Sequence, residues 1–207
     1  MTTAKPKIFV YGASGHGQVV IDIIERENLY SIQCVADDNL LLTGSDFCGY
    51  PVLGGKKEIA DSGKFPQKGI VAIGNNEARS LVYSWLKQRD IVPVTAIHPS
   101  VQLGRATQVG AGSVLMANVV VNPAVSIGEN CIVNTGATID HDCRLARDVH
   151  IAPGCTLCGS VHVGEKTFIG AGAIVIPNLR IGKNVFVAAG TTVYEDIPDF
   201  SRVVGPR

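Results

Sequence analysis

A six-residue repeat dominates the second half of the chain. From Ile97 to Val193 every sixth residue is aliphatic, through seventeen hexads without an insertion. A period of six is a multiple of the strand period of two and is not a helical period, so each aliphatic side chain keeps the same facing on a short strand. An ordinary sandwich of short strands would not hold one spacing through so many units. The repeat therefore predicts a parallel β-helix.

The residues around each aliphatic position fit this prediction. The position four residues later is mostly small or β-branched, as at Ser113, Ala137 and Cys155, which suits a narrow interior. Glycine often follows the aliphatic directly, as at Gly104 and Gly128, and we expect these glycines at corners where φ is positive. With three hexads to a coil of eighteen residues, the repeat gives five to six coils, stacked about 4.8 Å apart.

Composition limits the classes of partner. The formal net charge is zero, so we expect neither a nucleic acid nor an anionic membrane as partner. No apolar run reaches the length of a membrane-spanning helix and no signal peptide precedes Lys7, so we expect a cytoplasmic protein. Cys131, Cys143 and Cys155 fall at the small inward position of the repeat. We therefore expect buried thiols rather than disulfides or zinc ligands.

The residues before the repeat alternate between strand and helix patterns. Strands are expected over 7–11, 32–36, 69–74 and 91–94, and helices over 18–26, 56–60 and 77–88, with 50–55 as a link. This alternation predicts a small, Rossmann-like parallel α/β domain. We place that domain at 1–92, the β-helix at 93–198 and a C-terminal tail at 199–207.

Polar loops follow three of these strands. Gly12, Gly15 and Gly17 form a glycine turn at the start of a helix, where backbone N–H groups and the helix dipole favour an anion. The spacing differs from the dinucleotide fingerprint, so NAD is not implied. Asp37-Asp38 ends the second strand and Asn75 follows the third. Open α/β sheets bind ligands at such carboxyl ends, although the acidic pair also suits a simple turn.

One hexad, 139–144, departs from its neighbours because Asp140 and Asp142 flank His141. A carboxylate bonded to one imidazole nitrogen raises the basicity of the other, as a general base requires. A surface histidine in a polar turn is the plainer alternative. Eighteen residues per coil stack His141 against Gly159, whose N–H could stabilise an oxyanion. His150 and His162 fall on other faces, so we expect no metal site.

Taken together, these motifs resemble one family. The G-x-S-G-H-G turn, the acidic pair, the I-G-N-N segment and the solenoid with x-H-[DE] are similar to the bacterial nucleotide-amino-sugar N-acetyltransferases and the related sialic acid O-acetyltransferases. The likeness covers nearly the whole chain, although the ending V-G-P-R departs from the family's V-P-A-[KR]. The resemblance implies a left-handed β-helix, a homotrimer, and acetyl-CoA as cosubstrate in the groove between neighbouring solenoids, without a metal.

The resemblance also implies residue roles. His141 matches the general base, Asp142 its acidic partner, Gly159 the amide facing the thioester carbonyl, and His150 a histidine near acetyl-CoA. The nucleotide-sugar pocket is matched by Gly12, Ser14, Gly15, His16, Gly17, Asp37, Asp38 and Asn75. The implied activity is direct transfer of acetyl from acetyl-CoA to the amine of a nucleotide-linked amino-deoxy sugar. O-acetylation of a sugar such as sialic acid, and a non-catalytic module that binds sugar nucleotides, are the alternatives.

Overall fold

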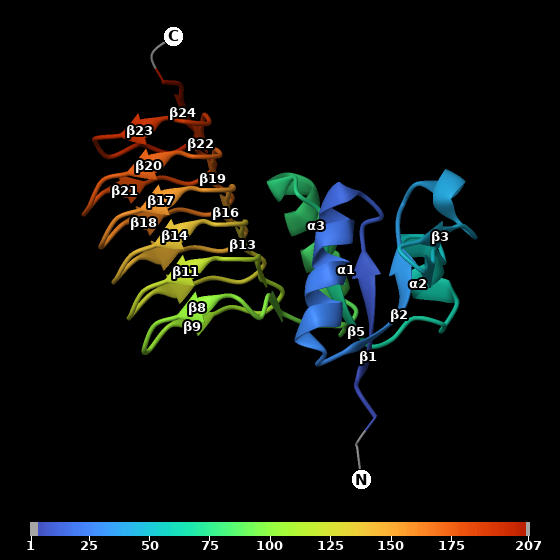
Figure 1. Cartoon of the computed structure of the whole chain (residues 1–207). Coiled ribbons are helices and arrows are strands. Elements are labelled where there is room, and N and C mark those ends of the chain that lie inside the picture. Colours follow the sequence, from blue (N-terminus) through green and yellow to red (C-terminus); the bar gives the residue numbers. More distant parts are fainter. Residues whose placement is uncertain (1–3, 206–207) are drawn as a thin grey trace. The chain divides into compact units, whose positions relative to one another are not determined.

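The computed structural model describes residues 4–205, which form two compact units divided between Ala96 and Ile97 (Figure 1). The first is an α/β unit, and the second is a β-solenoid whose coils stack one upon another. Within the described residues, no helix combines the length and the apolar character that crossing a membrane requires.

The α/β unit is built on a parallel four-stranded sheet with the order β2-β1-β5-β6. Its elements are β1 (Lys7–Tyr11), α1 (Gly15–Glu27), β2 (Ser31–Ala36), the 3-10 helix η1 (Leu40–Leu42), β3 (Asp46–Phe47), β4 (Tyr50–Pro51), α2 (Lys56–Asp61), β5 (Lys68–Val71), α3 (Asn76–Lys87) and β6 (Val92–Pro93). Helix α1 buries Val20, Ile23 and Ile24, which share one face because they are three and four residues apart. The predicted small parallel α/β fold is confirmed.

Two local predictions for this unit are wrong. Segment 50–55, expected as a link, begins with β4, which pairs antiparallel with β3. Cys48 and Gly49 form the tight turn of this hairpin with left-handed φ values of 54° and 83°. Helix α1 begins at Gly15 rather than at residue 18. Gly15 and Gly17 therefore lie in the first turn of the helix, and a Cβ on Gly17 would lie only 2.2 Å from the Gly12 carbonyl oxygen.

The solenoid consists of about six coils, and its two-residue strands form three parallel sheets. The seven-stranded sheet holds β7 (Ala96–Ile97), β10 (Val114–Leu115), β13 (Ile132–Val133), β16 (His150–Ile151), β19 (Phe168–Ile169), β22 (Phe186–Val187) and β24 (Arg202–Val203). The six-stranded sheet holds β8 (Gln102–Leu103), β11 (Val120–Val121), β14 (Thr138–Ile139), β17 (Thr156–Leu157), β20 (Ile174–Val175) and β23 (Thr192–Val193). The five-stranded sheet holds β9 (Gln108–Val109), β12 (Ser126–Ile127), β15 (Arg144–Leu145), β18 (His162–Val163) and β21 (Arg180–Ile181).

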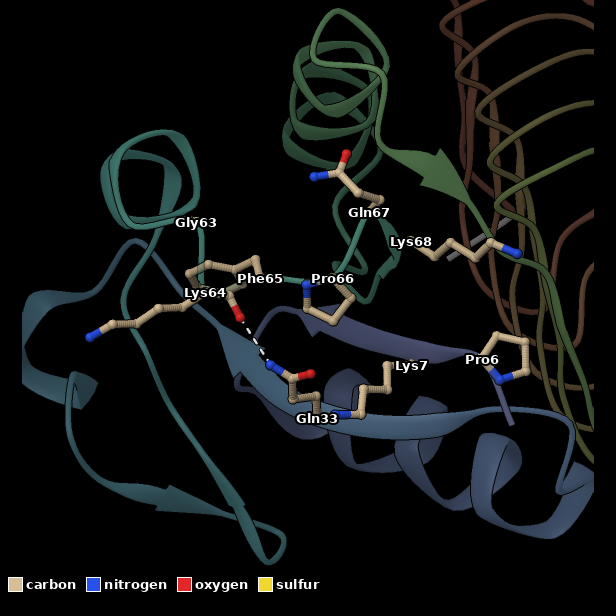
Figure 2. A pocket seen from close by; sticks show the side chains of 9 residues that line it. All are labelled: Pro6, Lys7, Gln33, Gly63, Lys64, Phe65, Pro66, Gln67 and Lys68. Atoms are coloured by element: carbon tan, nitrogen blue, oxygen red, sulfur yellow. Dashed lines mark hydrogen bonds between the residues drawn. The ribbon is translucent and has the colours of Figure 1, made fainter. Parts of the chain in front are cut away.

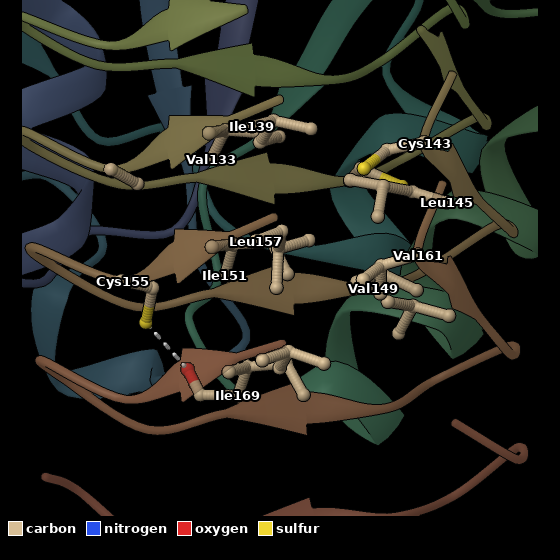
Figure 3. Close-up of a cluster of buried hydrophobic side chains, with 14 of the residues drawn as sticks. Val133, Ile139, Cys143, Leu145, Val149, Ile151, Cys155, Leu157, Val161 and Ile169 are labelled. Atoms are coloured by element: carbon tan, nitrogen blue, oxygen red, sulfur yellow. Dashed lines mark hydrogen bonds between the residues drawn. The ribbon is translucent and has the colours of Figure 1, made fainter. Parts of the chain in front are cut away.

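Neighbouring coils are in register at a separation of eighteen residues, as Thr138 opposite Thr156 and Ile139 opposite Leu157 show. Most of the repeating aliphatic side chains are buried and form one continuous core. In Figure 3 they point into the interior from successive coils. Burying each such side chain contributes about 1.5–3 kcal/mol. The β-solenoid predicted from the hexads is confirmed.

The small inward position also supplies hydrogen-bond donors inside the solenoid. The Cys155 thiol donates to the carbonyl oxygen of Gly170 over 2.9 Å, and Figure 3 shows this thiol beside the next coil. The Cys143 thiol donates to the carbonyl of Cys158 over 3.1 Å, and Ser113 makes the equivalent bond with its hydroxyl. These small side chains therefore fit the narrow interior and also donate hydrogen bonds to backbone carbonyl groups there.

The expected role of the glycines that follow the aliphatic residues is wrong. Gly104 does not have a left-handed φ; a Cβ there would lie 2.4 Å from the backbone nitrogen of Pro123 on the next coil. The left-handed residue comes two positions later, at the corner, with φ values of 63° at Ala124, 61° at Asp142 and 65° at Gly154. Close approach of neighbouring coils, rather than turn geometry, thus explains these glycines.

The end of the chain differs from the expected tail at 199–207. Strand β24 pairs in parallel with β22, so Arg202 and Val203 continue the seven-stranded sheet. Pro206 and Arg207, which belong to the unusual ending of the sequence, lie outside the described residues.

Candidate active site

His141 lies at the corner of the solenoid between β14 and β15. Its side chain is 58% exposed, and Nδ1 is 2.8 Å from Oδ2 of Asp142. The left-handed backbone at Asp142 brings this side chain back beside the ring, and its N–H donates to the carbonyl of Pro123 over 3.2 Å. The turn therefore aligns the carboxylate with the imidazole.

The two flanking carboxylates favour the protonated imidazole. The hydrogen bond to Asp142, and then the charge of Asp140, raise the pKa of His141 above its ordinary value. A carboxylate at Nδ1 favours the tautomer with the proton on Nδ1, which leaves Nε2 with a free lone pair. The arrangement matches the requirements of a general base.

Gly159 lies on the next coil directly beside the ring of His141. A Cβ at this position would be 2.7 Å from both Cε1 and Nε2, so only hydrogen fits there. Among the described residues, no acceptor takes the N–H of Gly159. A reacting carbonyl near Nε2 would therefore lie close to an N–H donor that is not otherwise engaged.

Asn122 was missed by sequence reasoning. Its amide donates to Oδ1 of Asp140 over 2.7 Å, and this bond lowers the pKa of Asp140 below its ordinary value. The signal was present in the sequence, because Asn122 precedes Asp140 by eighteen residues and so occupies the same position one coil earlier.

Within one chain, the structure does not bring His150 to His141. Strand β16 belongs to the seven-stranded sheet, whereas His141 follows β14 of the six-stranded sheet. The His150 ring packs edge-on against Phe168 at 5.0 Å and lies 3.3 Å from the amide of Asn134. His162 lies in β18 of the five-stranded sheet. No group of three or more potential metal ligands occurs among the described residues.

The residues predicted to bind the sugar nucleotide lie at the carboxyl ends of β1, β2 and β5. The carboxylate of Asp37 accepts hydrogen bonds from the N–H groups of Ala13 and Asn39, each over 2.8 Å. Asp38 accepts from the N–H of Lys56 over 3.0 Å. Asp37 thus ties the glycine turn to the end of β2, whereas Asp38 ties the end of β2 to the start of α2.

The turn leaves polar groups available at this edge. Gly12 has a φ of 124°, and a Cβ there would lie 2.6 Å from the carbonyl oxygen of Ala72. Ser14 occupies the N-cap of α1 without a side-chain capping bond, and the space beside Gly15 is open. Asn75 caps α3 by accepting a backbone hydrogen bond. The start of α1 therefore keeps N–H donors that no capping side chain takes.

His16 is half-buried at the same turn. Its Nε2 atom is buried and has no hydrogen-bond partner among the described residues. Burial, and then the charge of Arg79, lower the pKa of His16 to about 4, so the ring is neutral near pH 7. A buried polar atom without a protein partner is usually matched by water or a ligand.

A pocket of about 440 Å³ lies at the opposite, amino-terminal edge of the sheet (Figure 2). Gln33 donates there to the carbonyl of Lys64 over 2.9 Å. Figure 2 shows Lys64 and Lys68 pointing away from one another. The ammonium groups of these two lysines therefore do not converge on one point.

Both units match known families. Residues 7–86 match the family described as the PglD N-terminal domain. Residues 106–141, 124–159 and 160–195 match the bacterial transferase hexapeptide repeat. A curated relative, the GDP-perosamine N-acetyltransferase of Escherichia coli O157:H7, is 26% identical over 176 residues, which is 80% of this chain and 76% of that protein.

Two solved structures resemble nearly the whole chain. The first is the perosamine N-acetyltransferase of Caulobacter crescentus, a histidine-to-asparagine variant in complex with CoA and GDP-perosamine. It is 34% identical, with 95% of this chain and 92% of that chain covered and a TM-score of 0.88. The second is the acetyltransferase domain of PglB from Neisseria gonorrhoeae FA1090 with acetyl coenzyme A, at 32% identity, 96% coverage of each chain and a TM-score of 0.87. On these grounds the chain belongs to the PglD-type nucleotide-sugar N-acetyltransferases, which carry a hexapeptide-repeat β-helix.

Proposed function

We propose that this protein transfers the acetyl group of acetyl-CoA to the amine of a nucleotide-linked amino-deoxy sugar, with His141 as general base. This proposal rests on the arrangement of Asp142, His141 and Gly159 at one corner of the solenoid. Asp142 bonds Nδ1 of His141, and Gly159 lies beside Nε2 on the next coil. The relatives support the substrate class, since one structure holds CoA with GDP-perosamine and another holds acetyl-CoA.

The proposed reaction needs no group beyond these residues and the two substrates. Nε2 of His141 takes a proton from the sugar ammonium, and the freed nitrogen attacks the thioester carbonyl carbon. The tetrahedral oxyanion accepts the N–H of Gly159. The carbon–sulfur bond then breaks, the imidazolium gives its proton to the CoA sulfur, and the acylated nitrogen releases its extra proton to solvent, so one proton is liberated per turnover. Asp142 stabilises the imidazolium between the two proton transfers of His141.

Direct attack is favoured because the interior thiols are poor nucleophiles. Cys143 and Cys155 are buried, and burial raises the pKa of Cys143 to about 11. The thiolate, rather than the thiol, attacks a thioester. Mixing the protein with acetyl-CoA alone should therefore release no stoichiometric burst of CoA. A burst that disappears in Cys143→Ser would contradict direct attack.

The sugar nucleotide is proposed to bind the α/β unit at the carboxyl edge of its sheet. Helix α1 begins there without a side-chain cap, and its free N–H groups suit the phosphates. The unpartnered Nε2 of His16 offers a further polar contact. Ser14, Gly15, Gly17, Asp38 and Asn75 complete the proposed pocket.

Acetyl-CoA is proposed to bind between copies of the chain in a homotrimer. Because His150 and His141 lie on different sheets of one chain, a common site needs a second solenoid. Closed cyclic assemblies place different faces of neighbouring subunits against each other. Sedimentation velocity should give the mass of three chains, and a fully active monomer would exclude this arrangement.

The decisive test is acetyl transfer by His141→Ala, with His162→Ala as a matched control on another sheet. UDP-, GDP- and dTDP-linked amino sugars would be supplied with acetyl-CoA, and free CoA thiol would be measured. We expect His141→Ala to lower kcat on the order of 10²-fold or more, with acetyl-CoA affinity near that of the wild type. Near-normal turnover would remove His141 from the mechanism. Transfer to sialic acid hydroxyls alone would favour O-acetylation.

A further inference from the structure

Asp140 has half of its carboxylate unused. Its Oδ1 atom accepts from the amide of Asn122 over 2.7 Å and from the N–H of His141 over 2.8 Å. Its Oδ2 atom takes no hydrogen bond or ion pair within residues 4–205. Both bonds lower the pKa of Asp140, so the group is an anion near neutral pH. One anionic oxygen is therefore held in place next to the proposed base.

This carboxylate lies at a pocket on the six-stranded sheet. The pocket has a volume of about 240 Å³ and is formed by β11, β14 and β17 with the residues that follow them. Its described lining is otherwise neutral, with Thr138 and Thr156 among aliphatic residues, so Asp140 carries its only charge. A ligand that enters this pocket meets a single fixed negative charge beside His141.

The fold does not require that charge. Asn122 occupies the same position one coil earlier. One hexad earlier in the chain, Asn134 accepts from the N–H of the next residue over 2.8 Å, as Asp140 does. Asparagine can therefore accept the same backbone hydrogen bond at such a corner. The negative charge of Asp140 must have a reason other than the fold.

We propose that Asp140 is the receptor for the ammonium group of the acceptor sugar. This inference rests on the proposed function. Oδ2 of Asp140 binds one N–H of the ammonium, and Nε2 of His141 removes a second proton. The amine then attacks the thioester as described above, and the proton ends on the CoA sulfur. Asp140 thus selects an amine over a hydroxyl at the reacting position, while Asn122 positions the carboxylate.

The test compares binding of two ligands in the absence of acetyl-CoA. Calorimetry would use nucleotide-linked 4-amino-4,6-dideoxyhexoses carrying UDP, GDP or dTDP, and the matching 4-hydroxyl sugars. In Asp140→Asn, we expect the amino sugar to bind roughly tenfold more weakly, because hydrogen bonds to charged groups are stronger than neutral ones. Binding of the hydroxyl sugar should stay within twofold. Equal loss for both ligands, or for neither, would overturn the proposal.

Kinetics and controls separate this role from a structural one. Asp140→Asn should raise KM for the amino sugar but not for acetyl-CoA, Asp140→Glu should restore part of the loss, and Asn122→Ala should give a smaller rise. Glu195→Gln, which removes an exposed carboxylate from the same corner three coils later, should change nothing. If the wild type acetylates no amino sugar, the proposed function fails and this inference with it. If the wild type does acetylate amino sugars, and Asp140→Asn still prefers the amino sugar over the hydroxyl sugar as strongly as the wild type, only the role of Asp140 is wrong.

Discussion

We expect Asp142 to set the pH at which His141, the proposed general base, can accept a proton. The carboxylate raises the pKa of His141, so the neutral ring that can accept a proton accumulates only above a pH higher than usual for histidine. We expect kcat/KM to rise with pH through an inflection above about 6.5. In Asp142→Asn this inflection should move to lower pH, while the plateau falls because the ring is less well oriented. A profile unchanged by Asp142→Asn would contradict the pairing.

The substitution Gly159→Ala tests the close contact between Gly159 and the His141 ring on the neighbouring coil. A methyl group there would approach the His141 ring to 2.7 Å, and the exposed ring would turn away to avoid it. Since misplacing a catalytic group by an ångström can cost roughly 10²-fold in rate, Gly159→Ala should lower kcat by about that factor. Thermal melting should change little. For comparison, Gly205→Ala meets its nearest atom at 3.4 Å and should leave kcat unchanged.

At the scale of the element, each corner of the solenoid needs a residue in the left-handed region. Ala124 occupies one such corner with a φ of 63° and an exposed side chain. Because this conformation costs a non-glycine residue about 1 kcal/mol, Ala124→Gly should raise the free energy of unfolding by about that amount. The same change at Ala146, whose φ is not left-handed, should lower it. Chemical denaturation followed by circular dichroism would show both signs.

The repeat made the solenoid predictable because its period of six survives without an insertion. The same period predicted that His141 meets Gly159 and that Cys143 and Cys155 point inward. It could not show why Gly104 is glycine, since the cause is the backbone of Pro123 on another coil. The β3–β4 hairpin was missed because its strands are two residues long and carry no alternating pattern.

At the scale of the whole molecule, the two units should divide the substrates. Asp37 holds the glycine turn through the N–H of Ala13, so Asp37→Ala should loosen the turn. We expect KM for the sugar nucleotide to rise several-fold while KM for acetyl-CoA barely moves. Asp61→Ala, at the exposed end of α2, serves as the control. Weaker CoA binding alone in Asp37→Ala would show that the ligands are assigned to the wrong units.

Contacts between candidate site residues were easier to predict on the solenoid than on the α/β unit. A fixed period converts sequence distance into spatial distance, so His141 and Gly159 could be paired from their numbers. At the sheet edge, loop conformation decides the contacts. Sequence reasoning did not foresee that Asp37 would bond Ala13, or that Asn75 would cap α3. Nor did a single repeat unit indicate that Asp140 would be anchored by Asn122.

The eighteen-residue register also limits how such a chain can change over evolutionary time. A tandem duplication of one full coil would preserve the pairing of strands in all three sheets and leave a histidine at the position of His141 facing a glycine. A gain or loss of one hexad between His141 and Gly159 would move all later residues onto the next face of the solenoid. It would thereby separate the proposed base from the proposed oxyanion donor. Length variation among descendants of this gene should therefore come in whole coils, and should spare the stretch from 141 to 159.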